Sequence, residues 1–328
     1  FKTKKNIYIL QSEHFVEAYK QIATGLLGAK AGSDAYKTAV EANKYIDYHV
    51  IGSFSSPQLW ERFDKNGVMI PYNDQRWPND LDTKVATARD ETVYFWLTVP
   101  RKEVSPRKDG KPTGTVILGH GYGGNRTDIL SMGGLMAKWG MSAIAIDCVS
   151  HGLDLKSTDK ALAEVITAQY GLKAFMKAVF KDRAWDQNFD GAVDSGADFW
   201  SAYVFHTRDM VRQSAVDYMQ LVRILRSFDG TTRWDMDVDG DGTKELAGDF
   251  DADGNVDIGG KDSIIAMTGG SLGGIMSMTM GGLEPEVSVI APVAGGAGLA
   301  DVGIRSRQGG VHEAYILRAM GPIITGTP

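Results

Sequence analysis

Short apolar runs alternate with segments of helical spacing along most of this 328-residue chain. The runs expected as strands are 92–100, 115–119, 141–147, 263–268 and 286–293. Nearly every residue in the shorter runs is apolar, which is typical of strands buried on both faces of a parallel sheet. The alternation therefore predicts an α/β fold, in which helices cover both faces of a mostly parallel sheet.

The apolar residues between these strands follow helical spacing in three segments, 125–140, 208–228 and 271–282. Asn125 or Thr127 can cap the first segment, and Gly140 can end it. The second segment is the clearest amphipathic helix of the chain. Its expected buried face consists of Met210, Val211, Ser214, Ala215, Tyr218, Leu221, Val222 and Leu225.

The remaining sequence divides into an N-terminal extension and two insertions. Residues 1–91 are expected to wrap around a core domain at 92–328, and 47–82 has the Pro, Asn and Asp content of a loop. Residues 152–207 and 229–262 interrupt the alternation of strands and helices. We interpret both as insertions at the edges of the sheet that form a cap or lid.

Composition excludes several classes of protein. The net charge is −6 and no basic stripe is present, which argues against nucleic-acid binding. No apolar run approaches the roughly 18 residues of a transmembrane helix. The single cysteine, Cys148, excludes an internal disulfide and leaves the compartment open. The sequence begins with Phe1 rather than Met, from which we expect an upstream piece, and this favours export.

One serine lies in a glycine-rich turn between an expected strand and an expected helix. The sequence is Gly269-x-Ser271-x-Gly273. A serine at the tip of such a turn exposes its hydroxyl above the sheet, and the glycines remove side chains that would collide. The first amides of the following helix point to the same place, where they can stabilise an oxyanion. Ser271 is therefore a candidate nucleophile.

Two further motifs follow earlier strands. The first is His120-Gly121-Tyr122-Gly123-Gly124 after 115–119, and the second is Asp147-x-x-x-His151-Gly152 after 141–147. With Gly269-x-Ser271-x-Gly273 in the same order, residues 92–294 resemble the α/β-hydrolase family, in particular secreted bacterial lipases and esterases. The resemblance implies an α/β-hydrolase fold with an acyl-transferring serine.

Carried over position by position, the resemblance assigns roles to several residues. Ser271 matches the nucleophile, and the backbone amides of Leu272 and Tyr122 match the oxyanion hole. The glycines that match the turn of the oxyanion loop are Gly121, Gly123 and Gly124. His120 and His151 match structural positions, so neither is expected to be the catalytic base.

The acid and the base are harder to place. In the family they follow the nucleophile in the order acid, then histidine. The candidates after Ser271 are Asp301 and His312, both weak, and His206 precedes the nucleophile. We expect the C-terminal strands of the fold to lie outside this sequence. We therefore predict that the acid and histidine lie on a complementary C-terminal fragment of the same polypeptide, bound tightly over the hydrophobic edge of the sheet.

Three acidic loops share the pattern D-x-[DN]-x-D-G-x-x-[DE]. Oxygens at positions 1, 3, 5 and 9, with the carbonyl of position 7, converge when the loop curls at the glycine, and such a set selects Ca²⁺. The expected ligands are Asp186, Asn188, Asp190, Ala192 and Asp194; Asp237, Asp239, Asp241, Thr243 and Glu245; and Asp249, Asp251, Asp253, Asn255 and Asp257.

The loops resemble those of EF-hand, dockerin and integrin-type repeats, but they lack the closing Glu at position 12, where Ala197, Gly248 and Gly260 stand. Calcium in these loops is expected to hold the cap in place without taking part in the chemistry. Millimolar extracellular calcium suits them, so the protein is expected to be secreted or at the cell surface, periplasm included.

Taken together, these features predict a calcium-stabilised serine hydrolase of small-molecule or lipid esters. A peptidase or acyltransferase on the same fold is one alternative. A non-catalytic, calcium-dependent binding protein is the other.

Overall fold

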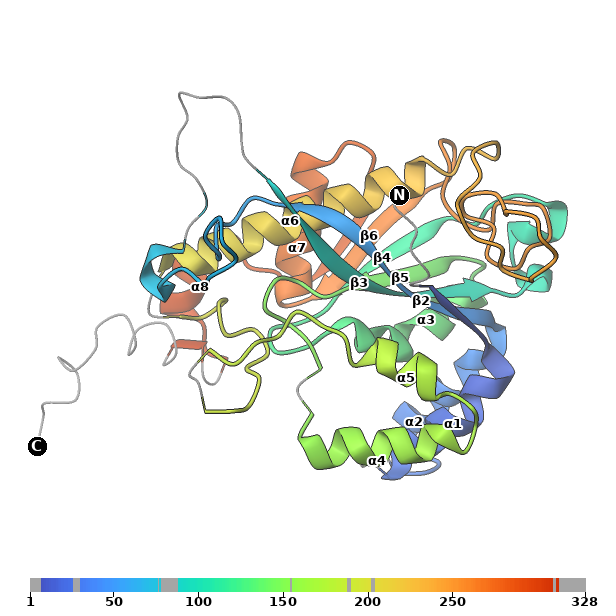
Figure 1. Ribbon diagram of the computed structural model, residues 1–328, viewed down its shortest axis with the longest axis horizontal. Coiled ribbons are helices and arrows are strands. Elements are labelled where there is room, and N and C mark those ends of the chain that lie inside the picture. Colours follow the sequence, from blue (N-terminus) through green and yellow to red (C-terminus); the bar gives the residue numbers. More distant parts are fainter. Residues whose placement is uncertain are drawn as a thin grey trace, which may run out of the picture.

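A central sheet of seven strands organises the computed structural model shown in Figure 1. The structure describes residues 7–25, 30–75, 77, 88–153, 155–187, 190–201, 204–308 and 311–312. Within these ranges the strands are β1 (Tyr8–Gln11), β2 (Ile46–Gln58), β3 (Arg89–Pro100), β4 (Thr115–Gly119), β5 (Ser142–Ile146), β6 (Ile265–Gly270) and β7 (Val289–Val293). The strand order is β1-β2-β3-β5-β4-β6-β7.

The expected parallel core is confirmed. β5, β4, β6 and β7 are parallel neighbours, whereas β3, β2 and β1 are added to them antiparallel. Helices cover both faces, as expected. They are α1 (Ser12–Gly25), α2 (Asp34–Ala42), α3 (Ile129–Lys138), α4 (Ser157–Ala168), α5 (Lys173–Val179), α6 (Val204–Arg226), α7 (Leu272–Leu283) and α8 (Leu299–Arg305).

Alternation along the strands divides the interior into two cores. In β5, Ile144 and Ile146 belong to the core beneath α6 and α7, whereas Ala143 and Ala145 belong to the core that faces α1, α3 and α5. Figure 1 shows α6 and α7 above the sheet and α1, α3 and α5 below it. The predicted buried face of the long amphipathic helix is confirmed, because all eight of its residues are buried in α6.

The expectation of a loop at 47–82 is wrong for its first part, which forms the long strand β2. Gly52, Pro57 and several serines give this segment its loop-like composition. The segment is nevertheless a strand because it pairs with β3 from Ile46 to Gln58. Packing requires a glycine at position 52, because the ring of Phe95 covers this residue. A Cβ atom on Gly52 would lie 2.6 Å from Cζ of Phe95.

The two insertions lie at opposite ends of the strands. The amide of Thr113, just before β4 begins, donates to the carbonyl of Asp257 at 2.9 Å, which places residues 229–262 at the amino ends of β4 and β6. The amide of Gly196 donates to the carbonyl of Ser150 beyond the carboxyl end of β5, at 2.7 Å. Of the described parts of the two insertions, the one at 152–207 therefore lies at the carboxyl ends of the strands, where β6 ends at Gly270 and leads into Ser271.

No helix in the described part of the chain is both long enough and apolar enough to span a bilayer.

Candidate active site

Ser271 occupies the turn between β6 and α7. Its backbone has φ 56° and ψ −113°, a combination that residues with a side chain adopt only when their surroundings enforce it. The amide of Ser271 donates to the carbonyl of Val293 at 2.9 Å and so ties the turn to the end of β7. Such strain concentrates at functional sites, and positive φ is shared by Ala294, directly after β7, and by Ser150, four residues after β5.

Two glycines let the strained turn pack against β4. A Cβ atom on Gly269 would lie 2.4 Å from the carbonyl oxygen of Gly119, and one on Gly273 would lie 2.1 Å from the same oxygen. Both distances are shorter than any real contact. The spacing of Gly269-x-Ser271-x-Gly273 is therefore a packing requirement, as the sequence predicted.

The glycine-rich loop after β4 lies beside the serine. A Cβ atom on Gly121 would lie 4.0 Å from Cβ of Ser271, so the next residue, Tyr122, is adjacent to the turn. Leu272 is the first residue of α7, and amides in a first helical turn have no acceptor within the helix. Of the two predicted oxyanion-hole residues, Leu272 thus follows the serine directly, and Tyr122 follows a glycine that lies beside it. The fold is that of the α/β-hydrolases.

Side chains at both ends fix the glycine-rich loop. His120 is buried, and its ring joins the carbonyl of Gly121 at Nδ1 (2.8 Å) to the amide of Cys148 at Nε2 (2.9 Å). Because Nε2 accepts from an amide, Nδ1 carries the proton. At the other end Asp147 accepts from the amide of Arg126 at 2.7 Å and pairs with its guanidinium. His120 therefore has the structural role expected for it.

His151 lies behind the same loop, as the motif implied. It is fully buried, its Nδ1 bonds the carbonyl of Val149 at 2.9 Å, and no hydrogen-bond partner of its Nε2 is found among the described residues. Burial lowers the pKa of His151 to about 3, so its ring is neutral. The ring centroids of His151 and His120 are 4.9 Å apart.

The structure does not bring the in-chain acid and base candidates to the serine. His312 is exposed, and its Nδ1 bonds the carbonyl of Ile304 at 2.8 Å. Asp301 is exposed and pairs with Arg305 at 3.3 Å. His206 is buried at the start of α6 against Asp198, at 3.4 Å. Across the described ranges, no hydrogen bond joins Ser271 Oγ to a histidine.

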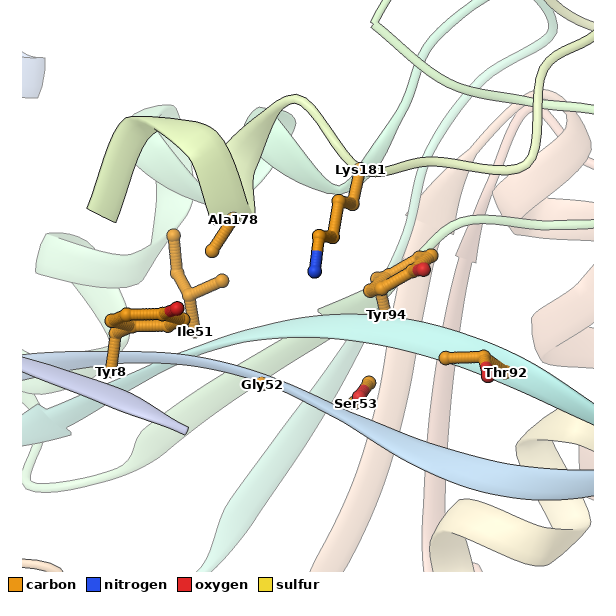
Figure 2. Close-up of a pocket in the computed structure, with 8 residues that line it drawn as sticks. All are labelled: Tyr8, Ile51, Gly52, Ser53, Thr92, Tyr94, Ala178 and Lys181. Carbon is orange, nitrogen blue, oxygen red and sulfur yellow. The ribbon is translucent and has the colours of Figure 1, made fainter. Parts of the chain in front are cut away.

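A small pocket elsewhere on the sheet does not compete as a site. It has a volume of about 110 Å³ and lies between β1, β2, β3 and the end of α5. Figure 2 shows Lys181 pointing into it between Tyr8 and Tyr94. Its lining contains no carboxylate and no imidazole, so it lacks the acid–base pair that hydrolysis requires.

The three acidic loops share one hydrogen-bond frame. The carboxylate at position 1 accepts from the amide of the glycine at position 6, at 2.8, 2.9 and 2.9 Å. The carboxylate at position 9 accepts from the amide at position 2, at 3.0, 2.9 and 2.7 Å. The glycines have positive φ, as the predicted sharp turn requires; they are Gly191, Gly242 and Gly254.

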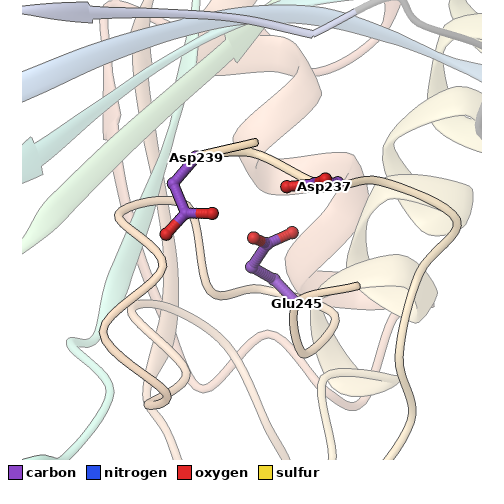
Figure 3. A group of neighbouring side chains, drawn as sticks. All are labelled: Asp237, Asp239 and Glu245. Carbon is purple, nitrogen blue, oxygen red and sulfur yellow. The ribbon is translucent and has the colours of Figure 1, made fainter. Parts of the chain in front are cut away.

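Two of the loops bring three carboxylates together. Oxygens of Asp237, Asp239 and Glu245 all lie within 4.8 Å of one another, as do those of the corresponding group in 249–257. Figure 3 shows the first group converging on one point. In the third loop Asn188 lies outside the described residues. In all three loops the carboxylate at position 5 accepts from the amide two residues further along, at 2.6, 2.8 and 2.9 Å. These residues are Asp241, Asp253 and Asp190.

Two cations that the sequence analysis missed approach the loop at 249–257. Arg107 donates from Nε to Asp257 at 2.7 Å and from Nη2 to Asp251 at 2.6 Å, and Lys102 pairs with Asp251 at 3.0 Å. Residues this far apart in the sequence leave no local signal of their contact. Oδ1 of Asp251 nevertheless has no partner among the described residues. Burial raises the pKa of Asp257 to about 6, and the charge of Asp251 adds to the rise.

No family model and no curated protein matches the chain. The similarities found are to solved structures. An S-formylglutathione hydrolase from Agrobacterium tumefaciens is 12% identical, with a TM-score of 0.34 over 81% of this chain and 68% of that one. An acetyl xylan esterase from Paenibacillus sp. R4 is 16% identical, with a TM-score of 0.30 over 80% of this chain and 58% of that one.

A cold-adapted esterase from an Arctic intertidal metagenomic library is 12% identical, with a TM-score of 0.30 over 74% of this chain and 59% of that one. The chain therefore spans less than two thirds of the length of both esterases.

Proposed function

We propose that this protein is a serine hydrolase that cleaves carboxylic ester bonds through an acyl-enzyme on Ser271. The observation that carries the proposal is the strained turn at φ 56°, which leads directly into α7 and has Gly121, the residue before Tyr122, beside it. That arrangement supplies a nucleophile together with amide donors for the oxyanion.

The reaction follows from the geometry. Oγ of Ser271 attacks the ester carbonyl and loses its proton to a base, while the carbonyl oxygen becomes an oxyanion between the amides of Leu272 and Tyr122. The positive end of the α7 dipole favours the same charge. As the intermediate collapses, the C–O bond to the leaving group breaks and the base gives the serine proton to the departing oxygen, which leaves as the alcohol. Water, deprotonated by the same base, then attacks the acyl-enzyme, and the proton returns to Oγ of Ser271 as the carboxylic acid is released.

The acid and the base would come from a complementary C-terminal segment of the same polypeptide. The edge strand β7 supports this, because Val289 and Val293 are 53% and 60% exposed, an unusual state for a strand of this fold's core. A covering segment would bury these side chains and place its histidine at Ser271. Intact mass under denaturing conditions is expected to show this segment in the active protein, and an active protein without it would contradict the assignment.

Substrate turnover tests the proposal. The full-length protein is expected to hydrolyse chromogenic short- and medium-chain acyl esters, and to do so faster than matched peptide substrates. Faster peptide cleavage would instead identify a peptidase on the same fold. No turnover of either class by folded protein would favour a calcium-dependent binding protein.

Calcium would bind in the acidic loops and stabilise the fold. The donor set consists of hard oxygens without Cys or His, and the orphaned Oδ1 of Asp251 is the kind of ligand that a cation satisfies. The loops at 237–245 and 249–257 lie at the amino ends of β4 and β6, so their calcium would hold the core rather than a lid over Ser271. Because such loops suit millimolar calcium, we place the protein outside the cytoplasm, secreted or at the cell surface.

Chelation is expected to lower stability substantially. With calcium at about 100 times Kd, each occupied loop contributes about 3 kcal/mol to the free energy of unfolding. Asp237→Asn should remove the contribution of the loop at 237–245 to the free energy of unfolding. The change replaces one carboxylate oxygen of Asp237, the position 1 ligand that also accepts from the amide of Gly242. Asp262→Asn is the matched control, since Asp262 is exposed and lies outside both loops. Equal melting temperatures in calcium and in EDTA would contradict the calcium assignment.

A further inference from the structure

Gly196, in the insertion, lies directly against the loop that carries Tyr122. Its φ is +80°, and a Cβ atom there would lie 2.6 Å from Nε2 of His151 and 2.9 Å from Cε2 of Tyr122. No residue with a side chain fits at this position without moving one of the two rings. The insertion therefore touches the predicted oxyanion hole at a point where only a glycine is tolerated.

The position of Gly196 is fixed by hydrogen bonds on both sides. Its amide donates to the carbonyl of Ser150 at 2.7 Å, and its carbonyl accepts from the amide of Phe199 at 2.9 Å. Ser150 itself has φ 58° and is fully buried. Gly196 is thus anchored to the buried segment that follows β5, and it cannot retreat from the Tyr122 ring.

Two further side chains complete what we term the Tyr122 seat, defined as His151, Gly196 and Phe199. The ring centroid of Tyr122 is 6.2 Å from that of His151 and 5.7 Å from that of Phe199. His151 and Phe199 are both buried, so neither can swing out of the way. Tyr122 itself is 42% exposed.

We propose that the Tyr122 seat positions the backbone amide of Tyr122 for the oxyanion, with Gly196 as the positioning residue on which the seat depends. The ring of Tyr122 is held between Gly196 and two buried rings, so we expect a side chain added at 196 to be accommodated in part by a shift of the loop backbone that carries the amide. A displacement of about 1 Å costs on the order of 100-fold in rate, comparable to the loss of one oxyanion donor. The proposal rests on the proposed function of Ser271, and it assigns to the insertion at 152–207 a part in catalysis.

Gly196→Ala tests the seat against a matched control. The variant is expected to lower kcat for ester hydrolysis about 100-fold, with KM within about twofold, because the amide acts on the transition state. The control is Gly171→Ala, since Gly171 lies in the same insertion with φ +72° and has no atom within 4 Å of an added Cβ. It carries the same backbone strain and should leave kcat unchanged.

Two further measurements extend the test, and the first of them keeps it decisive where Gly196→Ala folds poorly. Phe199→Leu trims the seat from its other side and should lower kcat while KM stays constant. The effects of Tyr122→Ala and Gly196→Ala should be strongly non-additive, because both act through one ring.

The outcomes separate the two claims. Wild-type protein without turnover or fluorophosphonate labelling contradicts the proposed function itself. An active wild type in which Gly196→Ala and Phe199→Leu match Gly171→Ala overturns the seat alone. A fall in kcat confined to the two seat variants, with melting temperatures near that of the control, supports it.

Discussion

Replacing Ser271 by alanine is expected to lower kcat for ester hydrolysis by about 10⁶-fold. The acyl-enzyme cannot form without the hydroxyl, and the neighbouring amides alone stabilise only an oxyanion produced by direct attack of water. The backbone of the variant stays in the same strained conformation, so its free energy of unfolding should match that of the wild type. Steady-state kinetics and urea unfolding measure the two quantities.

Ser271→Gly is the companion variant. Glycine adopts φ 56° without strain, so this change should raise the free energy of unfolding by about 1 kcal/mol while activity is lost as in the alanine variant. An inactive protein that is more stable than the wild type separates a strained catalytic serine from a structural one. Retained turnover in either variant would remove Ser271 from the mechanism.

Gly273→Ala is expected to destabilise the fold by about 3 kcal/mol or more. The added Cβ would lie 2.1 Å from the carbonyl oxygen of Gly119, and that atom belongs to the backbone of β4, so no side chain can yield. Either α7 or β4 must then shift, which also disturbs Ser271 at the start of the helix. Urea unfolding gives the magnitude, and kcat should fall with it.

Gly282→Ala is the control in the same helix. An added Cβ there meets nothing within 4 Å, so the change should stabilise α7 by about 0.5–1 kcal/mol. Similar unfolding curves for the two variants would show that the close approach of α7 and β4 does not constrain the turn.

Local sequence patterns predicted those parts of the fold whose determinants are local. The run 115–119 coincides with β4, and the eight residues expected on the buried face of α6 are buried. The strand, glycine turn and helix around Ser271 were predictable for the same reason. Each of these features depends on residues only a few positions apart.

Features that depend on distant residues could not be predicted in this way. β2 has the composition of a loop and becomes a strand because β3 pairs with it and Phe95 covers Gly52. The contact of Arg107 with Asp257 joins residues 150 positions apart. Gly196 has no motif around it, and only the fold shows that it supports the ring of Tyr122. Spacing also could not show that His312 bonds the carbonyl of Ile304.

The position of a fluorophosphonate adduct tests most directly whether Ser271 is the nucleophile. The full-length protein, incubated with the probe and digested, is expected to carry a single adduct on the peptide that contains Ser271, and the adduct should be absent from Ser271→Ala. Folded, ester-hydrolysing protein that carries its adduct on another residue, or none at all, would contradict the assignment of Ser271 as the nucleophile.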